Sequence, residues 1–289
     1  MAMHKFLKRV IGPLVQARAP MVIVEVGALT GVNTRWLANW AHGHDATLHC
    51  IDPRPRFDVE RLAREHDGHF VMHVGLSLEV MPEIGPADLV LLDGDHNWYT
   101  AFHELQLIDR LNPQEWPLVL MHDVDWPFAR RDMYHAPANI PERYRQPMRK
   151  AGLVRYRSAL VDKGGEVSDF FNAEHEGGAR NGVLTAIEEF LASTERDLRL
   201  LVARGPSGLG LLVDPAAAGR YPQLLETLEA VHDPKLAVSV SPMYATRELL
   251  PVPRSAQWRL PGRRNMITHA RFRLRRASRV IGAFRKAGS

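Results

Sequence analysis

The sequence predicts an α/β fold, namely a Rossmann-like, doubly wound sheet of seven strands with helices on both faces. Three observations carry this prediction. Short apolar runs alternate with helical patterns between residues 21 and 123. Successive runs start about 20–30 residues apart, which suits right-handed βαβ crossovers. A short segment with two glycines joins the last two runs, residues 198–204 and 209–214, and such a link is typical of a hairpin. Five parallel strands followed by an antiparallel pair are therefore expected.

The five parallel strands correspond to short apolar runs. They are residues 21–27, 46–52, 69–74, 87–93 and 117–123. Helical patterns follow them at residues 30–42, 59–66, 77–80, 99–111 and, after a gap, 183–193. Near-continuous apolar runs indicate strands that are covered on both faces.

The chain divides into three parts by pattern. Residues 1–20 predict an amphipathic N-terminal helix, and residues 21–215 predict the sheet domain. Within that domain, residues 124–181 interrupt the alternation of apolar runs and helical patterns, which indicates an insertion with little regular structure. The remaining residues, 216–289, form an extension with a helix near 221–231 and a basic amphipathic helix over 264–286.

Composition is that of a globular protein, with 45% hydrophobic and 24% charged residues. The single cysteine, Cys50, excludes an internal disulfide and favours a cytoplasmic location. No apolar run approaches the length of about 20 residues that a membrane span needs. The net charge of +4 is uneven, because residues 249–289 hold eleven Arg and Lys and no acid, which leaves −7 for the rest.

A glycine-containing turn follows the first expected strand. Glu25, Gly27 and Gly31 form an ExGxxxG pattern there, and Asp52 ends the second strand. Glycine lets a ligand approach the backbone closely, and an acid at the second strand can bind ribose hydroxyls. The pair indicates an adenosine-containing cofactor; a plain tight turn and an ordinary loop acid are the alternatives.

Two acids end the fourth and fifth expected strands. Asp93 and Asp123 should lie side by side, and a divalent cation such as Mg²⁺ would relieve their repulsion. Alternation along the strand is expected to turn His122 away from Asp123. His96, in the loop after Asp93, could act as a general base. Helix capping and solvation of a loop are the alternatives for these residues.

These segments resemble a known family. The stretches VEVGALTG, CIDP, ADLVLLDGDH and LVLMHD, in this order and spacing, resemble the class I S-adenosylmethionine-dependent methyltransferases over about residues 20–215. The DGDH and HD pair is similar to the branch that contains the macrocin and mycinamicin O-methyltransferases. Those enzymes tend to carry two adjacent acids where this chain has His122 and Asp123.

The resemblance implies a role for each matched residue. Glu25, Gly27 and Gly31 would shape the pocket for the methionine part of S-adenosylmethionine, and Asp52 would bind its ribose. Ser77 would contact the adenine, Asp93 and Asp123 would bind Mg²⁺, and His96 would be the general base. Asp93 would also contact the cofactor and take part in catalysis.

The insertion directly follows Asp123 and is expected to form a lid over the cleft, because loops longer than about 12–15 residues are usually functional lids or disordered. Five of its side chains could bind an acceptor: Trp126, Arg130, Tyr134, His135 and His175. The alternative is a surface excursion that packs its own aromatic residues. The basic helix could dock on the body or on a second subunit, lie on an anionic membrane surface, or bind an acidic partner or nucleic acid.

The function that these expectations favour is metal-assisted O-methylation of a sugar hydroxyl on a glycoside, a polysaccharide or a natural product. A homo-oligomer is expected, membrane-peripheral localisation stays open, and nucleic acid is not the expected partner. A hydroxylase-like relative on the same fold and a non-catalytic cofactor-binding or scaffold protein are the alternatives.

Overall fold

The computed structural model describes residues 3–231 of the chain. Its main sheet has seven strands in the order β3-β2-β1-β4-β5-β10-β9. The strands are β1 Val22–Val26, β2 Thr47–Ile51, β3 Phe70–His73, β4 Leu89–Leu92, β5 Leu118–His122, β9 Arg199–Ala203 and β10 Leu209–Val213. The first five are parallel, while β10 runs antiparallel to both β5 and β9. The predicted fold class, with its terminal hairpin, is confirmed.

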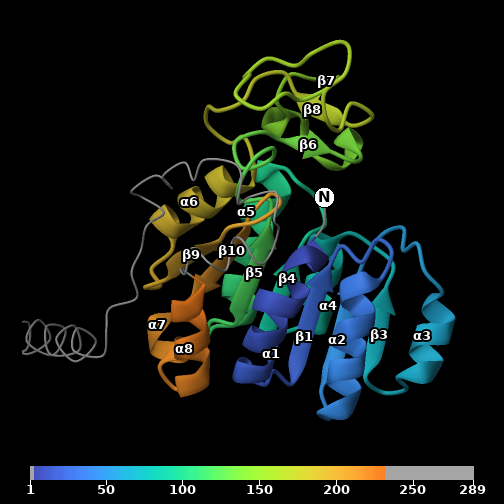
Figure 1. Cartoon of the computed structure of the whole chain (residues 1–289), viewed down its shortest axis with the longest axis vertical. Coiled ribbons are helices and arrows are strands. Elements are labelled where there is room, and N and C mark those ends of the chain that lie inside the picture. The colour runs from blue at the N-terminus through green and yellow to red at the C-terminus, as the bar shows by residue number, and fades with distance from the viewer. Residues whose placement is uncertain (1–2, 232–289) are drawn as a thin grey trace, which may run out of the picture.

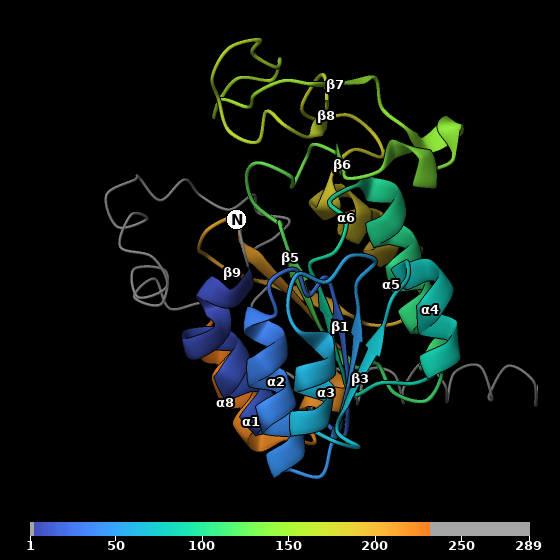
Figure 2. The same cartoon turned by 90° about the vertical axis from the view of Figure 1, so that its right-hand side faces the viewer.

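Helices cover both faces of this sheet (Figures 1 and 2). One face carries α1 Gly12–Arg18, α2 Val32–Gly43, α3 Val59–Glu65 and α8 Pro222–Ala230, and the other carries α4 Ser77–Ile84, α5 Trp98–Leu111 and α6 Val183–Ser193. The short α7, Pro215–Ala218, precedes α8. Alternate side chains of one strand enter opposite cores: Leu89 and Leu91 pack toward α1 and α2, and Val90 and Leu92 pack toward α5.

The chain before α1 is also helical. A 3₁₀ turn, Met3–Phe6, and a π-helical turn, Leu7–Ile11, lead into α1. Helix α1 packs against α8, and the Arg18 guanidinium lies 4.5 Å from the centre of the Tyr221 ring. Both ends of the described chain therefore contribute to the same core. The expected basic helix over residues 264–286 lies outside the described residues.

The insertion stands beyond the carboxyl ends of the parallel strands (Figure 1). It contains a small antiparallel sheet in the order β6-β8-β7, formed by Met133–Tyr134, Phe171–Ala173 and Met148–Lys150, with 3₁₀ turns at Pro137–Asn139 and Glu142–Tyr144. The expectation of little regular structure missed this sheet, because strands of two or three residues are too short to show a period. Among residues 3–231, no helix combines the length and apolar character of a membrane span.

Buried Asp132 ties the insertion to the main domain. Its Oδ1 accepts the N–H groups of Trp98 at 2.8 Å and Gly182 at 2.6 Å, where α5 and α6 begin. Its Oδ2 accepts the Tyr134 hydroxyl at 2.7 Å. One side chain thus fixes the insertion to two helices.

Candidate active site at the carboxyl edge of the sheet

The turn after β1 lies directly against the end of β4. Gly27 has a φ of +89°, and a Cβ atom there would stand 2.3 Å from the carbonyl oxygen of Asp93. Gly31 has a φ of +73° and leaves room for the Phe57 ring, which would be 2.9 Å from a Cβ atom. Only glycine combines this backbone angle with such close approach. Gly27 therefore lets the turn contact Asp93, and Gly31 lets it pack against Phe57.

Asp52 holds this turn in shape. Its Oδ2 accepts the backbone N–H groups of Ala28 and Leu29, both at 2.9 Å, and its Oδ1 accepts that of Arg54 at 2.7 Å. A carboxylate has about four acceptor positions, so Asp52 can still accept a ribose hydroxyl. Its ribose-binding role remains a prediction.

Glu25 lies beneath the turn and is 2% exposed. Burial raises its pKa to about 7, and the Cys50 thiol lies 3.5 Å from its Oε2. Ser77, at the start of α4, is also buried and donates its hydroxyl to Glu104 Oε1 at 2.5 Å. Glu25 and Ser77 thus lie within the core, and their roles in cofactor binding remain predictions.

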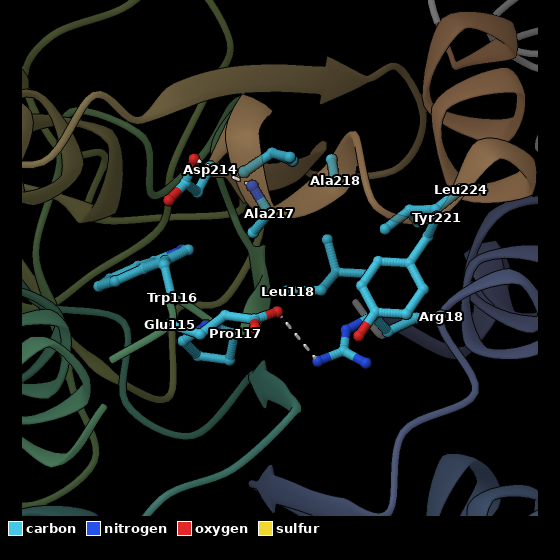
Figure 3. A pocket seen from close by; sticks show the side chains of 11 residues that line it. Arg18, Glu115, Trp116, Pro117, Leu118, Asp214, Ala217, Ala218, Tyr221 and Leu224 are labelled. Atoms are coloured by element: carbon cyan, nitrogen blue, oxygen red, sulfur yellow. Dashed lines mark hydrogen bonds and ion pairs between the residues drawn. The ribbon is translucent and has the colours of Figure 1, made fainter. Parts of the chain in front are cut away.

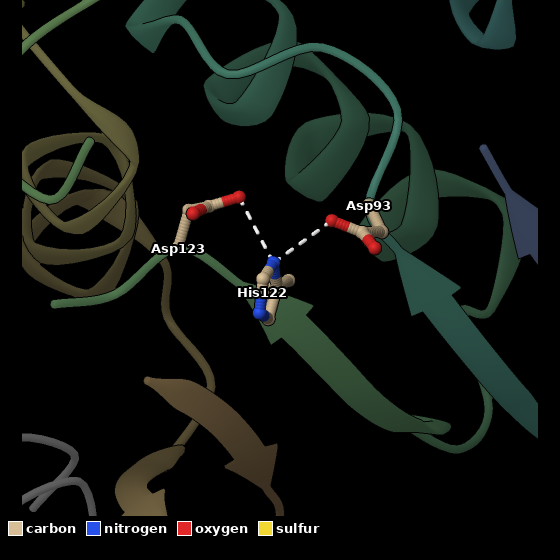
Figure 4. A group of neighbouring side chains, drawn as sticks. All are labelled: Asp93, His122 and Asp123. Atoms are coloured by element: carbon tan, nitrogen blue, oxygen red, sulfur yellow. Dashed lines mark hydrogen bonds and ion pairs between the residues drawn. The ribbon is translucent and has the colours of Figure 1, made fainter. Parts of the chain in front are cut away.

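Asp93, His122 and Asp123 form what we term the acid–histidine cluster (Figure 4). The Nδ1 atom of His122 lies 3.0 Å from Asp93 Oδ1 and 3.0 Å from Asp123 Oδ2. Burial lowers the pKa of His122, but the two carboxylates outweigh burial and hold it well above the usual value. The three side chains offer ligand atoms within 4.8 Å of one another, which is compact enough for one metal ion.

The expectation that His122 turns away from Asp123 is wrong. Strand β5 ends at His122, and Asp123 takes a left-handed backbone angle, φ +63°, which interrupts the alternation. Its carboxylate consequently lies on the same side as the imidazole. The His122 Nε2 atom lies 3.1 Å from the carbonyl oxygen of Pro206 in the β9–β10 turn. Since a carbonyl only accepts, Nε2 carries a proton and Nδ1 faces the acids.

His96 forms a second pair with Asp123. Its Nδ1 lies 2.7 Å from Asp123 Oδ2, and its ring stacks on Phe128 with the centroids 5.2 Å apart. Burial lowers the pKa of His96, but Asp123, Asp93 and Asp95 together raise it above the usual value. Because Asp123 binds Nδ1, the imidazole presents Nε2 as the nitrogen that can exchange a proton.

The insertion brings one of its five predicted acceptor-binding residues to His96. His135 is exposed, and its ring centroid lies 5.6 Å from that of His96 and 5.2 Å from that of Phe170. The backbone N–H of Met133 donates to the His96 carbonyl at 3.0 Å, which fixes β6 beside the loop. Burial, followed by His96, lowers the pKa of His135, so it is neutral near pH 7.

The other four residues have different surroundings. Arg130 pairs with both carboxylate oxygens of Glu188 in α6, at 2.5 and 2.7 Å. Tyr134 is 1% exposed, so its ring has no free face for stacking on a sugar, which contradicts its predicted role. Trp126 is half-buried, with the Arg155 guanidinium 5.5 Å from its ring centre, and His175 is an exposed side chain in a turn.

Several residues that contact the acid–histidine cluster or His96 lie far from the sequence motifs and were not predicted. Pro206 comes from the hairpin turn, Phe128 from the insertion, and the N–H of Met3 donates to Asp93 Oδ2 at 3.2 Å. The ring of Phe6 meets that of His122 edge-on. No sequence pattern links these residues to the cluster; only the short spacing between Asp123 and Phe128 pointed toward the site.

The opposite, amino edge of the sheet carries a different charged group (Figure 3). A pocket there is lined by residues of α1, the segment that leads into β5, the end of β10, α7 and the start of α8, among them Arg18, Glu115 and Tyr221. Arg18 lies 3.0 Å from Asp88 Oδ1 and 3.6 Å from Glu115 Oε1. At this edge, the positive charge of Arg18 is paired with negative charges.

A known protein family matches the part of the chain that forms the carboxyl edge of the sheet. Residues 24–124 match the family model described as a methyltransferase domain. The matched stretch spans about a third of the chain and contains the end of β1, all of β2 to β5, the glycine turn, Asp52, His96 and the acid–histidine cluster. The resemblance to methyltransferases is thereby confirmed at that level, whereas no finding tests the macrocin-type branch.

Solved structures with a similar chain path are distant in sequence. A methyltransferase of Podospora anserina bound to S-adenosylhomocysteine is 14% identical, with a TM-score of 0.43, over 70% of this chain and 75% of that chain. A protein of Klebsiella pneumoniae described as a proposed O-methyltransferase is 18% identical, with a TM-score of 0.39, over 73% and 80%. No curated protein matches the chain.

Proposed function

We propose that this protein is an S-adenosylmethionine-dependent O-methyltransferase that acts on a sugar hydroxyl. The observation that carries the proposal is the His96–Asp123 pair, at 2.7 Å, on the same edge as the glycine turn that touches Asp93. A methyl donor in the turn and a proton acceptor across the edge are the two parts that O-methylation needs.

The main chain of the glycine turn forms the side of the site that would hold the methyl donor. The turn from Gly27 to Gly31 has left-handed backbone angles at both glycines, and Asp52 fixes it through two peptide N–H groups. S-Adenosylmethionine supplies an activated methyl group on a sulfonium centre. The sulfur–methyl bond breaks as the oxygen–methyl bond forms, and the hydroxyl loses its proton.

His96 is placed to receive that proton at Nε2. Asp123 accepts from Nδ1 and orients the ring, as a carboxylate orients a catalytic histidine in other general-base pairs. The stacked Phe128 ring limits rotation of the imidazole. Holding the hydroxyl between this nitrogen and the donor supplies much of the rate through positioning.

The acid–histidine cluster, with two carboxylates and one imidazole, fits a divalent cation: the carboxylates suit Mg²⁺ or Mn²⁺, and the imidazole suits a transition metal. Asp93 Oδ1 and His122 Nδ1 face one another, and among residues 3–231 the buried Asp123 Oδ1 has no hydrogen-bond partner. His122 donates Nε2–H to a carbonyl, as metal-bound histidines usually do. When bound there, the cation would stabilise negative charge on the acceptor oxygen. Asp93, His122 and Asp123 would hold it, while Asp123 Oδ2 still orients His96.

The acceptor side favours a neutral, hydroxyl-rich molecule. His135 of the insertion lies across from His96, and a neutral imidazole both donates and accepts hydrogen bonds. The half-exposed Phe170 ring beside it offers an apolar face of the kind that packs on a sugar ring. These two residues support a glycoside or a related sugar compound as the acceptor class.

The proposal is tested by methyl transfer from methyl-labelled S-adenosylmethionine, with MgCl₂, to a panel of methyl glycosides, glycosylated natural products and simple phenols. We expect label on a sugar oxygen, located by mass spectrometry. Label on phenols alone would replace the sugar with another hydroxyl acceptor. Absence of transfer together with absence of S-adenosylhomocysteine binding would contradict the proposal as a whole.

A further inference from the structure

The first described residues of the chain lie against the acid–histidine cluster. The peptide N–H of Met3 donates to Asp93 Oδ2 at 3.2 Å. The Phe6 and His122 rings meet edge-on, with centroids 6.1 Å apart and planes at 71°. The Met3 and Phe6 side chains are buried, at 1% and 0% exposed. A segment some ninety positions away in sequence thus touches two of the three cluster residues.

The Met3 contact fixes the orientation of a carboxylate. Asp93 Oδ1 lies 3.0 Å from His122 Nδ1, and Oδ2 is held by the Met3 N–H. Rotation of this carboxylate would break a hydrogen bond to an ionised acceptor, which is stronger than one between neutral groups. The N–H therefore holds the plane of the carboxylate so that its other oxygen faces His122.

The Phe6 contact does the same for His122. The imidazole is held on one side by the Pro206 carbonyl, 3.1 Å from Nε2, and its ring packs against the edge of Phe6. Partners that orient a ligand without touching the metal typically change metal affinity by about 10- to 100-fold when they are mutated.

The N-terminal segment that carries Met3 and Phe6 is anchored in the core. The helical path from Met3 to Arg18 buries Val10, Ile11 and Leu14 in the core that α2 and α8 share. Met3 and Phe6 are therefore presented to the cluster by a fixed support.

We propose that Met3 and Phe6 are positioning residues of the active site, which hold Asp93 and His122 in the arrangement that binds a divalent cation. This inference rests on the proposed function, because it assumes the cation site beside the methyl donor. It gives the N-terminal helix, which its sequence pattern sets apart from the sheet domain, an indirect part in the chemistry through Asp93 and His122.

The Met3 part is tested by comparing Met3→Pro with Met3→Ala. Both variants lose the side chain, but only Met3→Pro loses the N–H, and proline is tolerated in the first turn of a helix. Binding of Mn²⁺ is measured by calorimetry and by electron paramagnetic resonance. We expect about tenfold weaker Mn²⁺ binding in Met3→Pro than in Met3→Ala. Equal affinities in the two variants would overturn the role of Met3.

The Phe6 part is tested by comparing Phe6→Ala with Leu14→Ala. Both residues are 0% exposed and lie in the same core, so both changes should lower Tm. Only Phe6→Ala should weaken Mn²⁺ binding, because Leu14 does not belong to the site. A matching loss in both variants would reduce Phe6 to a core residue and overturn its role.

The two proposals fail in different ways. A wild-type protein that binds no Mn²⁺ overturns the positioning inference, even if it binds S-adenosylhomocysteine and transfers methyl groups. A wild-type protein that binds Mn²⁺ but neither binds S-adenosylhomocysteine nor transfers methyl groups overturns the proposed function, and the Met3 and Phe6 comparisons still decide the inference.

Discussion

The carboxyl and amino edges of the sheet both gather charged residues, but they balance these charges differently (Figures 3 and 4). At the amino edge, Arg18 lies against Asp88 and Glu115, and Arg220 reaches Glu115 at 2.6 Å. At the carboxyl edge, Asp93 and Asp123 share the single Nδ1 atom of His122. One edge pairs opposite charges, and the other concentrates acids around histidines.

This difference suggests that the charges at the amino edge stabilise the fold and that those at the carboxyl edge take part in function. A matched ion pair lowers the cost of its own burial. A cluster of acids around one imidazole nitrogen keeps unused acceptor capacity: within residues 3–231, Asp123 Oδ1 is buried without a hydrogen-bond partner, whereas Glu115 Oε1 at the amino edge, which also makes no hydrogen bond, lies 3.6 Å from the Arg18 guanidinium. We therefore expect mutations at the amino edge to change stability and mutations at the carboxyl edge to change catalysis.

The largest effect is expected from His96→Ala. Removal of the proton acceptor should lower kcat by about 10²–10⁴-fold, which is the usual contribution of a general base. The affinity for S-adenosylhomocysteine, measured by calorimetry, should stay within error, because the imidazole is paired with Asp123 on the acceptor side. His44→Ala, at an exposed histidine after α2, is the control. Full activity of His96→Ala would show that the base is elsewhere.

At the amino edge, Arg18→Leu should lower the free energy of unfolding by about 2–3 kcal/mol, since it leaves half-exposed Asp88 and Glu115 without their buried partner. Denaturant unfolding measures this loss. The exposed ion pair of Arg220 is worth less than about 1 kcal/mol, so Arg220→Ala is the matched control. Weaker S-adenosylhomocysteine binding in Arg18→Leu would break the proposed division between the edges.

Buried acids near the carboxyl edge should make stability depend on pH. Burial raises the pKa of Glu104 from 4.5 to about 8, so between these values the folded state binds more protons than the unfolded state. Stability is consequently highest at low pH in this window and falls as pH rises, by up to about 1.4 kcal/mol per pH unit.

Glu104→Gln tests this account, because glutamine can still accept the Ser77 hydroxyl. The variant should gain stability relative to wild type as pH increases from 5 to 8 in thermal unfolding experiments. An unchanged difference between the two proteins across this range would contradict the raised pKa.

The smallest effect is expected at the insertion. His135→Asn should raise KM for the acceptor several-fold, since one hydrogen bond is worth about 1 kcal/mol, and should leave S-adenosylhomocysteine affinity unchanged. Steady-state kinetics with the acceptor found in the labelling experiment measure the change. A fall in kcat with KM unaltered would instead give His135 a part in the reaction step.

The five parallel strands and the terminal hairpin could be predicted from sequence because apolar runs, glycine turns and a short hairpin link are local signals. Asp93 and Asp123 were expected together because the fourth and fifth strands were expected to be neighbours, which the order of the sheet confirms. The position of His122 could not be predicted, because it depends on the left-handed angle of Asp123. Contacts such as Met3 with Asp93 depend on tertiary packing and leave no periodic trace.

The insertion shows the same limit at a smaller scale. Its aromatic and basic residues suggested acceptor binding, but Tyr134 donates its hydroxyl to Asp132 and Arg130 pairs with Glu188. Residue type alone does not reveal whether a polar side chain is already occupied by a partner. Of the five candidates, His135 is the one whose ring lies beside His96.

The central claim is that the carboxyl edge holds a methyl donor beside a proton acceptor. Calorimetric titration of the wild-type protein with S-adenosylhomocysteine, repeated with Gly27→Ala, tests it most directly. A Cβ atom at Gly27 would collide with the Asp93 carbonyl at 2.3 Å and deform the turn. We predict saturable binding at one site per chain in the wild type and loss of at least most of that affinity in Gly27→Ala. Equal binding by the two proteins, or none by the wild type, would contradict the claim.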